Sequence, residues 1–144
     1  MLERRGSKME TALTSSVDDV IKSENKISDL EKRIELLTSD ILPYYNSIFK
    51  ELCNANAQNA EILCDFIMTE YNNQNIKTNT KLTHIKIICW FSKYSNYKDF
   101  QLITRHNIID YLNSLRKIES IDPTHKWIGT YNIRQMILSK FFRI

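Results

Sequence analysis

The sequence predicts an all-α fold, and three observations support this prediction. Apolar residues recur at spacings of three, four and seven through most of the chain, which is the periodicity of helices that bury one face. The 144 residues include only two glycines and two prolines, too few for the tight turns of a hairpin-rich β fold. An apolar fraction of 42% is enough to build a core. We therefore expect a compact four-helix bundle in residues 59–144, preceded by a long helical extension in residues 1–58.

The extension carries a heptad pattern that gives it coiled-coil character. The a positions are apolar and seven residues apart: Leu13, Val20, Ile27, Ile34, Ile41 and Ile48. The best d positions are Leu30, Leu37 and Tyr44. Ser16 and Ser23 weaken the start of the pattern, and Pro43 is expected to break or kink the helix. The remaining heptads predict either a homodimer through residues 13–42 or packing of this helix against its own domain.

Four later segments have the apolar periodicity of amphipathic helices. They are residues 62–71, 80–91, 103–115 and 122–144. The polar tract Asn54–Asn59 is interpreted as a loop or an interruption of the helix, and as the boundary between the extension and the bundle. In the helix that contains the second segment, Lys81, Lys86 and Lys93 are expected to face mostly away from the core. Thr104 is predicted to cap the third segment.

The last segment is the most informative, because aromatic side chains anchor its apolar face. That face consists of Trp127, Tyr131, Leu138, Phe141 and Phe142. Pro123, with Asp122 before it as N-cap, predicts where this helix begins. Arg134 lies at the edge of the face, whereas Lys126 and Lys140 fall outside it. This arrangement suits a helix that packs on one side and meets an anion on the other, or an ordinary core helix with solvated lysines.

Charge is divided unequally between the two halves of the chain, whose net charge is +3. Residues 1–75 hold eight Lys and Arg against 13 Asp and Glu, whereas residues 76–144 hold 12 against four. A basic helical unit of this kind favours binding to a polyanion, although a charged surface that only keeps the protein soluble is the alternative.

Other classes of function find little support in the sequence. There is no HExxH motif, no glycine-rich phosphate loop and no Gly-x-Ser-x-Gly motif, so neither a catalytic site nor a cofactor or metal is expected. The three cysteines have no CxxC spacing and are expected to be reduced, buried thiols. The charged N-terminus resembles no secretory signal, and no apolar run is long enough to cross a membrane. We expect a cytoplasmic protein.

Four pieces of the second half, in order, resemble a known family. They are ILCDFIMTEY (62–71), TKLTHIKIICWF (80–91), ITRHNIIDYLNSL (103–115) and DPTHKWIGTYNIRQMILSKFF (122–142). Together they resemble the N-terminal core-binding, SAM-like domain of tyrosine recombinases, the phage-integrase and Xer group, particularly its archaeal members. The resemblance covers roughly residues 59–144, and its last block is the most specific. His84 stands where the family usually has Tyr, and Lys77 where it often has Ser.

The resemblance implies a domain that closes one side of a clamp around duplex DNA during DNA integration and recombination. The DNA contacts it suggests are Thr80, Lys81, His84, Lys86, Lys126, Thr130 and Arg134. Arg134 is the strongest candidate, because a guanidinium suits either a phosphate or a guanine edge. Helix N-termini at Thr80 and Thr124 are expected to offer free amides to phosphate oxygens. Trp127 and Tyr131 are assigned mainly to the core.

Such enzymes cut DNA with a separate catalytic domain, which holds a nucleophilic tyrosine and its Arg, Lys and His partners. No tyrosine in this sequence has such a set of basic partners. We therefore expect a chain that is not catalytic alone and that could act with an intact recombinase in trans. Two alternatives stay open at this point. The chain could be a protein-interaction module assembled through its heptads, or a non-functional remnant of a recombinase gene.

Overall fold

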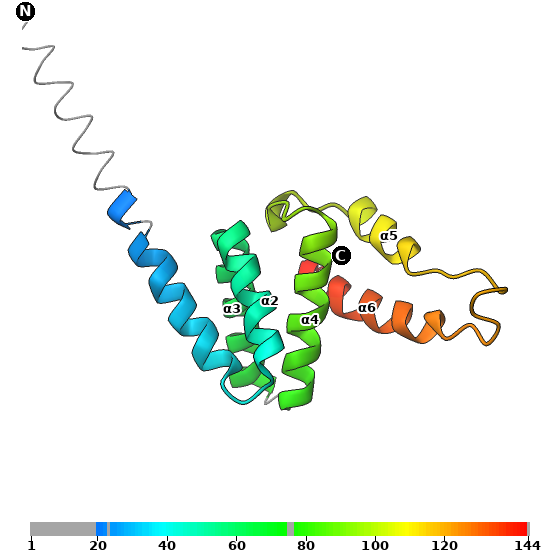
Figure 1. Ribbon diagram of the computed structural model, residues 1–144, viewed down its shortest axis with the longest axis horizontal. Helices are drawn as coiled ribbons and strands as arrows, with labels where there is room; N and C mark the ends of the chain where they lie inside the picture. The colour runs from blue at the N-terminus through cyan, green and yellow to red at the C-terminus, as the bar shows by residue number, and fades with distance from the viewer. Residues whose placement is uncertain (1–19, 23, 75–76, 144) are drawn as a thin grey trace, which may run out of the picture.

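The computed structural model describes residues 20–22, 24–74 and 77–143, and within them all regular structure is helical (Figure 1). The predicted all-α class is therefore confirmed. After a first helix at residues 24–38, the order is α2 (Pro43–Ala55), α3 (Ala57–Gln74), α4 (Thr78–Tyr94), the short 3-10 helix η1 (Phe100–Leu102), α5 (Arg105–Ser114) and α6 (Trp127–Phe142). The heptad positions Leu13, Ser16 and Ser23 lie outside the described residues.

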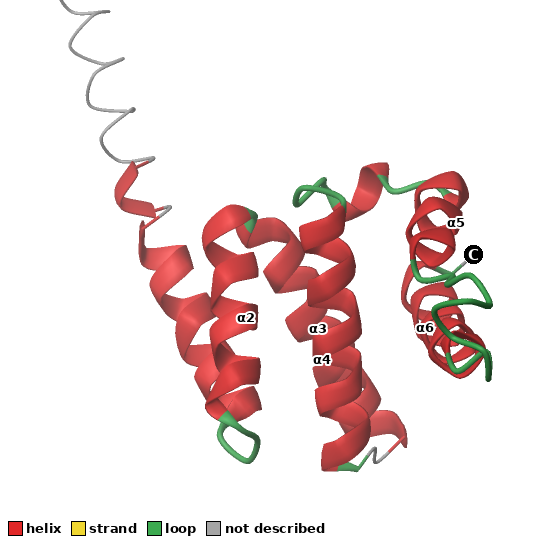
Figure 2. Cartoon of the chain, turned by 45° about the vertical axis from the view of Figure 1, so that its right-hand side comes forward, coloured by secondary structure: helices red, strands yellow, loops and turns green. Residues whose placement is uncertain are grey.

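The helices form two groups that cross one another. The first helix, α2, α3 and α4 lie side by side, whereas α5 and α6 form a hairpin beside α4 (Figure 1). Figure 2 shows this crossing from another side, with α5 and α6 nearly end-on while α2 and α4 stand upright. The connection at residues 115–126 projects beyond the ends of α5 and α6 (Figure 1). It is the part of the hairpin farthest from the larger group.

The first helix packs against its own domain. Leu30 and Ile34, from the d and a positions of the heptads, are buried in the core. Ion pairs also join this helix to its neighbours: Lys26–Glu61 at 3.1 Å, Arg33–Asp65 at 2.7 Å and Lys50–Glu35 at 2.8 Å. Of the two outcomes that the heptads predict, the structure thus shows packing within the chain. The same face cannot also pair with a second copy between residues 27 and 41.

Pro43 ends the first helical segment, as predicted. The helix stops at residue 38, Leu42 has an extended backbone, and Pro43 occupies the first turn of α2. The ring of a proline disfavours a helical residue before it but fits the first helical position, where no amide donor is needed. The side chain of Asn46 donates to the Thr38 hydroxyl over 2.9 Å and holds the turn.

Of the two outcomes predicted for Asn54–Asn59, the structure shows an interruption and not a loop, because only Asn56 lies between α2 and α3. Asn59 is fully buried in the first turns of α3. Its Nδ2 donates to the carbonyl of Lys98 over 2.9 Å, and its Oδ1 accepts from the amide of Phe100 over 2.9 Å. These polar side chains therefore tie the α2–α3 junction to the chain that follows α4.

The expected boundary between residues 58 and 59 falls inside α3. Buried residues on both sides of it belong to one cluster, which runs from Leu30 and Phe49 to Phe91 and Leu138. Within the described residues, the extension and the bundle thus share a single hydrophobic core.

The two predicted caps have different outcomes. Thr104 caps α5 as expected: its hydroxyl accepts from the amide of Asn107, and the Asn107 side chain accepts from the amide of Thr104. However, α6 begins at Trp127 and not at Pro123. His125 has a φ of 52°, which no right-handed helix can include. The carboxylate of Asp122 instead accepts from the amide of Trp127 over 3.0 Å.

None of the described helices has both the length and the hydropathy needed to cross a bilayer.

Candidate nucleic-acid interface

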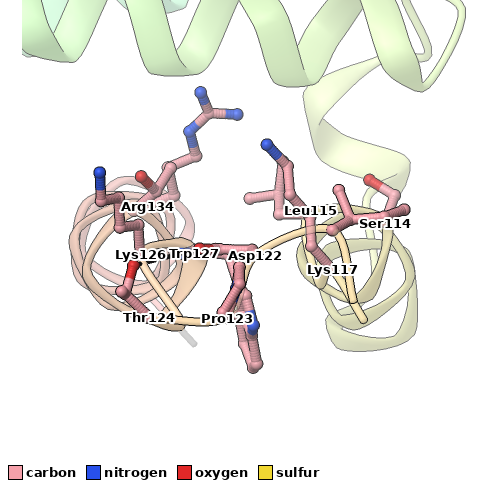
Figure 3. A pocket seen from close by; sticks show the side chains of 11 residues that line it. Ser114, Leu115, Lys117, Asp122, Pro123, Thr124, Lys126, Trp127 and Arg134 are labelled. Carbon is pink, nitrogen blue, oxygen red and sulfur yellow. Dashed lines mark hydrogen bonds between the residues drawn. The ribbon is translucent and has the colours of Figure 1, made fainter. Parts of the chain in front are cut away.

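A cleft of about 690 Å³ lies where the end of α5 faces the start of α6. We call it the α5–α6 cleft. Its polar lining includes Ser114 from α5, Lys117 and Lys126 from the connection, and Thr130 and Arg134 from α6. Figure 3 shows the two helices end-on with the connection between them. Arg134 extends toward α4, which is the green ribbon at the top of the view. Three cationic side chains thus line one concave surface.

Arg134 is held in place by two other helices. Its Nη1 donates a 2.6 Å hydrogen bond to the hydroxyl of Tyr111 in α5. Its guanidinium carbon lies 5.0 Å from the ring centroid of Trp90 in α4 and 5.9 Å from that of Tyr111. A guanidinium is weakly hydrated and stacks readily on aromatic faces, so this position costs little solvation. Within the described part of the chain, no carboxylate forms an ion pair with Arg134.

Trp90 connects Arg134 to a further cation on α4. The ammonium of Lys86, one helical turn earlier, lies 5.4 Å from the centroid of the Trp90 ring. The indole N–H of Trp90 donates to the hydroxyl of Tyr44 over 3.1 Å, which fixes the ring. Lys86 and Arg134 are therefore grouped around one aromatic side chain, although they come from different helices.

The acid that lines the α5–α6 cleft, Asp122, directs its charge toward the backbone of α6. Desolvation opposes its ionisation, but hydrogen bonds from the amides of Trp127 and Lys126 outweigh this and lower the pKa of Asp122. Its carboxylate therefore occupies the helix N-terminus that was expected to bind a phosphate. The predicted anion site at the Thr124 amide is wrong for this reason, and the cleft depends on its cationic side chains.

The structure brings together some of the predicted contact residues. Lys126, Thr130 and Arg134 line the α5–α6 cleft, and Lys86 adjoins it through Trp90. Thr80 is exposed on the first turn of α4, but it precedes Lys86 by six positions, which places it about 120° around the helix from Lys86. Its amide already donates to the carbonyl of Lys77 over 3.0 Å.

Two of the predicted contacts are buried instead. The side chain of Lys81 is only 5% exposed and forms an ion pair with Asp40, so the prediction that it faces away from the core is wrong. This hydrogen bond lowers the pKa of the Asp40 carboxyl. His84 is buried beside the ring of Phe66, and burial, followed by the charge of Lys140, lowers its pKa. Neither side chain is accessible to a phosphate.

The reason lies in the helical register of α4. Lys81, His84, Ile85 and Ile88 recur at spacings of three and four, so all four share the face that is turned to the core. Lys86 lies on a different side of the same helix. The periodicity is present in the sequence, but the charge of Lys81 favours a solvent-facing position, and the resemblance suggests His84 as a DNA contact.

Sequence reasoning missed four residues of this surface: Trp90, Tyr111, Arg116 and Lys117. The guanidinium of Arg116 lies 5.3 Å from the centroid of the Trp127 ring, and Lys117 lines the cleft. Two of these contacts have a signal in the sequence: Arg116 and Lys117 are adjacent basic residues, and Lys86 and Trp90 have i, i+4 spacing. The contact of Tyr111 with Arg134 joins residues 23 positions apart and leaves no such signal.

The described residues provide little for other chemistry. Within them, no three His, Cys, Asp or Glu side chains lie close enough to hold a metal ion. The three cysteines are buried and free, and burial raises the pKa of Cys64 to about 12, so this thiol is protonated at neutral pH.

Comparison with known proteins gave no match: no family model, curated protein or solved structure is significantly similar to the chain.

Proposed function

We propose that this chain binds duplex DNA through the α5–α6 cleft and the adjoining surface of α4. The observation that carries the proposal is the environment of Arg134. Its charge is oriented by Trp90 and Tyr111, both electrically neutral, and no described carboxylate pairs with it. A fixed cation that is not neutralised by its own protein is suited to an anion from outside.

The distribution of the other charges supports the same partner. Most acidic side chains belong to the first half, where Glu35, Glu61 and Asp65 pair with cations of the first helix and α2. The cations of the cleft, by contrast, border a concave surface with one acid, and that acid is engaged by the backbone of α6. Cations near phosphates release condensed counterions, which drives binding to nucleic acid at moderate salt.

The resemblance of residues 59–144 to the core-binding domain of tyrosine recombinases gives this binding a role. In that role the chain would hold one side of the duplex during DNA integration and recombination. Strand cleavage would belong to a catalytic domain acting in cis or in trans, and these residues would contribute binding alone. Lys86, Lys126, Thr130 and Arg134 would contact the DNA, whereas Lys81 and His84 would stabilise the fold.

The alternative of an interaction module assembled through the heptads has less support. The heptad side chains Leu30 and Ile34 are buried inside the chain, so they cannot form the seam of a dimer without unpacking the first helix.

Fluorescence anisotropy with a labelled 30-base-pair duplex tests the proposed function. The intact chain is required, because residues on both sides of position 58 share one core. We expect binding at low salt that weakens in the variant Lys117→Gln/Lys126→Gln. The control Lys93→Gln/Lys98→Gln removes the same charge from exposed positions outside the cleft and should bind as the wild type does. Equal losses in both variants would show that the cleft is not the binding surface, and no binding by the wild type would refute the proposal.

A further inference from the structure

We infer that Arg134 binds a backbone phosphate group and does not read a base edge. This inference rests on the proposed DNA binding and specifies the chemistry of its central contact. Arginine serves both roles in protein–DNA complexes, and its sequence context does not distinguish them. The geometry around Arg134 does.

The first argument is reach. A side chain that reads a base edge must extend into a groove of the duplex, and the major groove is about 8.5 Å deep. The guanidinium of Arg134 is instead partly buried and lies against Trp90, with Nη1 bonded to Tyr111. Extending it into a groove would break both contacts. A phosphate lies on the outside of the duplex and can approach the guanidinium where it is.

The second argument is the set of donors at this position. A guanidinium has five N–H donors, and Tyr111 accepts from Nη1, so other donors are left for a ligand. The ammonium of Lys126 and the hydroxyl of Thr130 line the same cleft. Several donors on one concave surface match an anion with several acceptor oxygens. The guanine edge that an arginine reads, by contrast, presents two coplanar acceptors and is matched by one guanidinium alone.

A third observation concerns Trp127, which also lines the cleft. Its indole N–H is buried and has no acceptor in the described part of the chain. Buried donors are nearly always paired in folded proteins. Because Trp127 lines the cleft, its indole N–H signal is suited to report on a ligand that enters it.

The first experiment compares Arg134→Gln with Arg105→Gln on three duplexes of unrelated sequence. Arg105 is exposed at the opposite end of α5, about 15 Å along the helix from the cleft, and its replacement removes the same charge. We expect Arg134→Gln to weaken binding by about 5- to 20-fold, equally on all three duplexes, and to reduce the salt slope by about one. Arg105→Gln should leave the affinity and the salt slope unchanged.

A different loss on each duplex would show that Arg134 reads bases, and no loss would show that it does not contact DNA. Either result overturns the inference, while duplex binding by the wild type would keep the proposed function. Arg134→Lys refines the comparison. A lysine keeps the charge and therefore the salt slope, but it lacks the planar group that stacks on Trp90, so affinity should still fall.

The second experiment does not depend on duplex binding. The side-chain N–H signals of Arg134 and Trp127 are followed by NMR as inorganic phosphate, or an oligomer of abasic deoxyribose phosphate, is added to the intact protein. We expect both signals to shift, more strongly with the abasic oligomer, while the Arg105 signal stays unchanged.

No shift at Arg134 with either probe would overturn the inference. Vesicles containing phosphatidylglycerol, which carry the same phosphodiester on a lipid, provide a further arm. Arg134-dependent binding to vesicles in preference to duplex would identify a lipid headgroup as the ligand. That result would overturn the inference about a DNA phosphate and the proposed function together.

Discussion

The guanidinium of Arg134 in α6 donates to the hydroxyl of Tyr111 in α5 over 2.6 Å, and this bond joins the two helices of the hairpin. Burial raises the pKa of Tyr111, and the nearby charge of Arg134 only partly opposes it. The hydroxyl is therefore neutral throughout the physiological pH range, and the positive charge of Arg134 is oriented without being neutralised. In a structural ion pair a carboxylate neutralises the cation, whereas the neutral hydroxyl of Tyr111 leaves the charge of Arg134 available to a ligand.

Tyr111→Phe removes the hydroxyl and keeps the ring. We expect duplex affinity to fall by about 2- to 5-fold, because Arg134 loses the acceptor that orients it but keeps its contact with Trp90. The salt slope should not change, since no charge is lost. Anisotropy titrations at several salt concentrations measure both quantities. A slope that falls as far as in Arg134→Gln would contradict a purely orienting role for the hydroxyl.

The ion pair between Lys81 and Asp40 predicts an effect on stability and none on DNA binding. Asp40→Ala removes the carboxylate that pairs with Lys81, whose side chain is only 5% exposed, and should lower the free energy of unfolding by about 1–3 kcal/mol. Lys81→Met removes the buried charge and keeps an apolar chain, so it should cost less. Urea unfolding compares the two variants. A loss of duplex affinity in folded Lys81→Met would instead restore Lys81 as a DNA contact.

His84 predicts a pH dependence of stability. Its folded-state pKa is lowered by burial and by Lys140, with Glu70 opposing, so the native state favours the neutral imidazole. Its contribution is fully present above the unfolded pKa of about 6.5 and is lost as the pH falls through the lower folded value.

The test compares the wild type with His84→Phe between pH 7 and pH 5. The free energy of unfolding of the wild type should fall relative to the variant by up to about 1.4 kcal/mol per pH unit. His84 Nδ1 is buried and has no partner among the described residues, so the variant should also be at least as stable at pH 7. Parallel curves for the two proteins would show that His84 does not titrate on unfolding in this range.

Asn59 predicts that the polar tract between α2 and α3 stabilises the fold. Asn59→Leu leaves the carbonyl of Lys98 and the amide of Phe100 without their partners and should cost about 2–4 kcal/mol. Asn54→Ala, a change at an exposed asparagine of the same tract, should stay within about 0.5 kcal/mol of the wild type. Thermal unfolding of both variants provides the comparison, and similar losses would mean that the buried amide contributes nothing specific.

The sequence predicted the features of the fold that depend on local rules. The break at Pro43 and the cap at Thr104 follow from the chemistry of single residues, and the structure has both. The packing partner of the first helix could not be predicted in this way, because a heptad face packs equally well on a second copy or on its own domain. The sequence left a loop and an interruption equally open at the α2–α3 junction, because the buried Asn59 looks the same in the sequence as an asparagine of a solvent-exposed loop.

The candidate site was only partly predictable for a related reason. The resemblance implied Lys126, Thr130 and Arg134 as DNA contacts, and all three line the cleft. The partners of Arg134 come from α4 and α5, and only the packing of those helices reveals them. Lys81 was misplaced because a lysine is rarely buried unless it is paired, and its partner Asp40 lies 41 residues away.

The most direct test of duplex binding at the α5–α6 cleft is the salt dependence of the affinity constant for duplex DNA. If Lys86, Lys117, Lys126 and Arg134 each neutralise one phosphate, a plot of log affinity against log salt should have a slope of about −3.6. The triple variant Lys117→Gln/Lys126→Gln/Arg134→Gln should flatten the slope to about −1. Binding that does not depend on salt, or a slope that the triple variant leaves unchanged, would contradict the account.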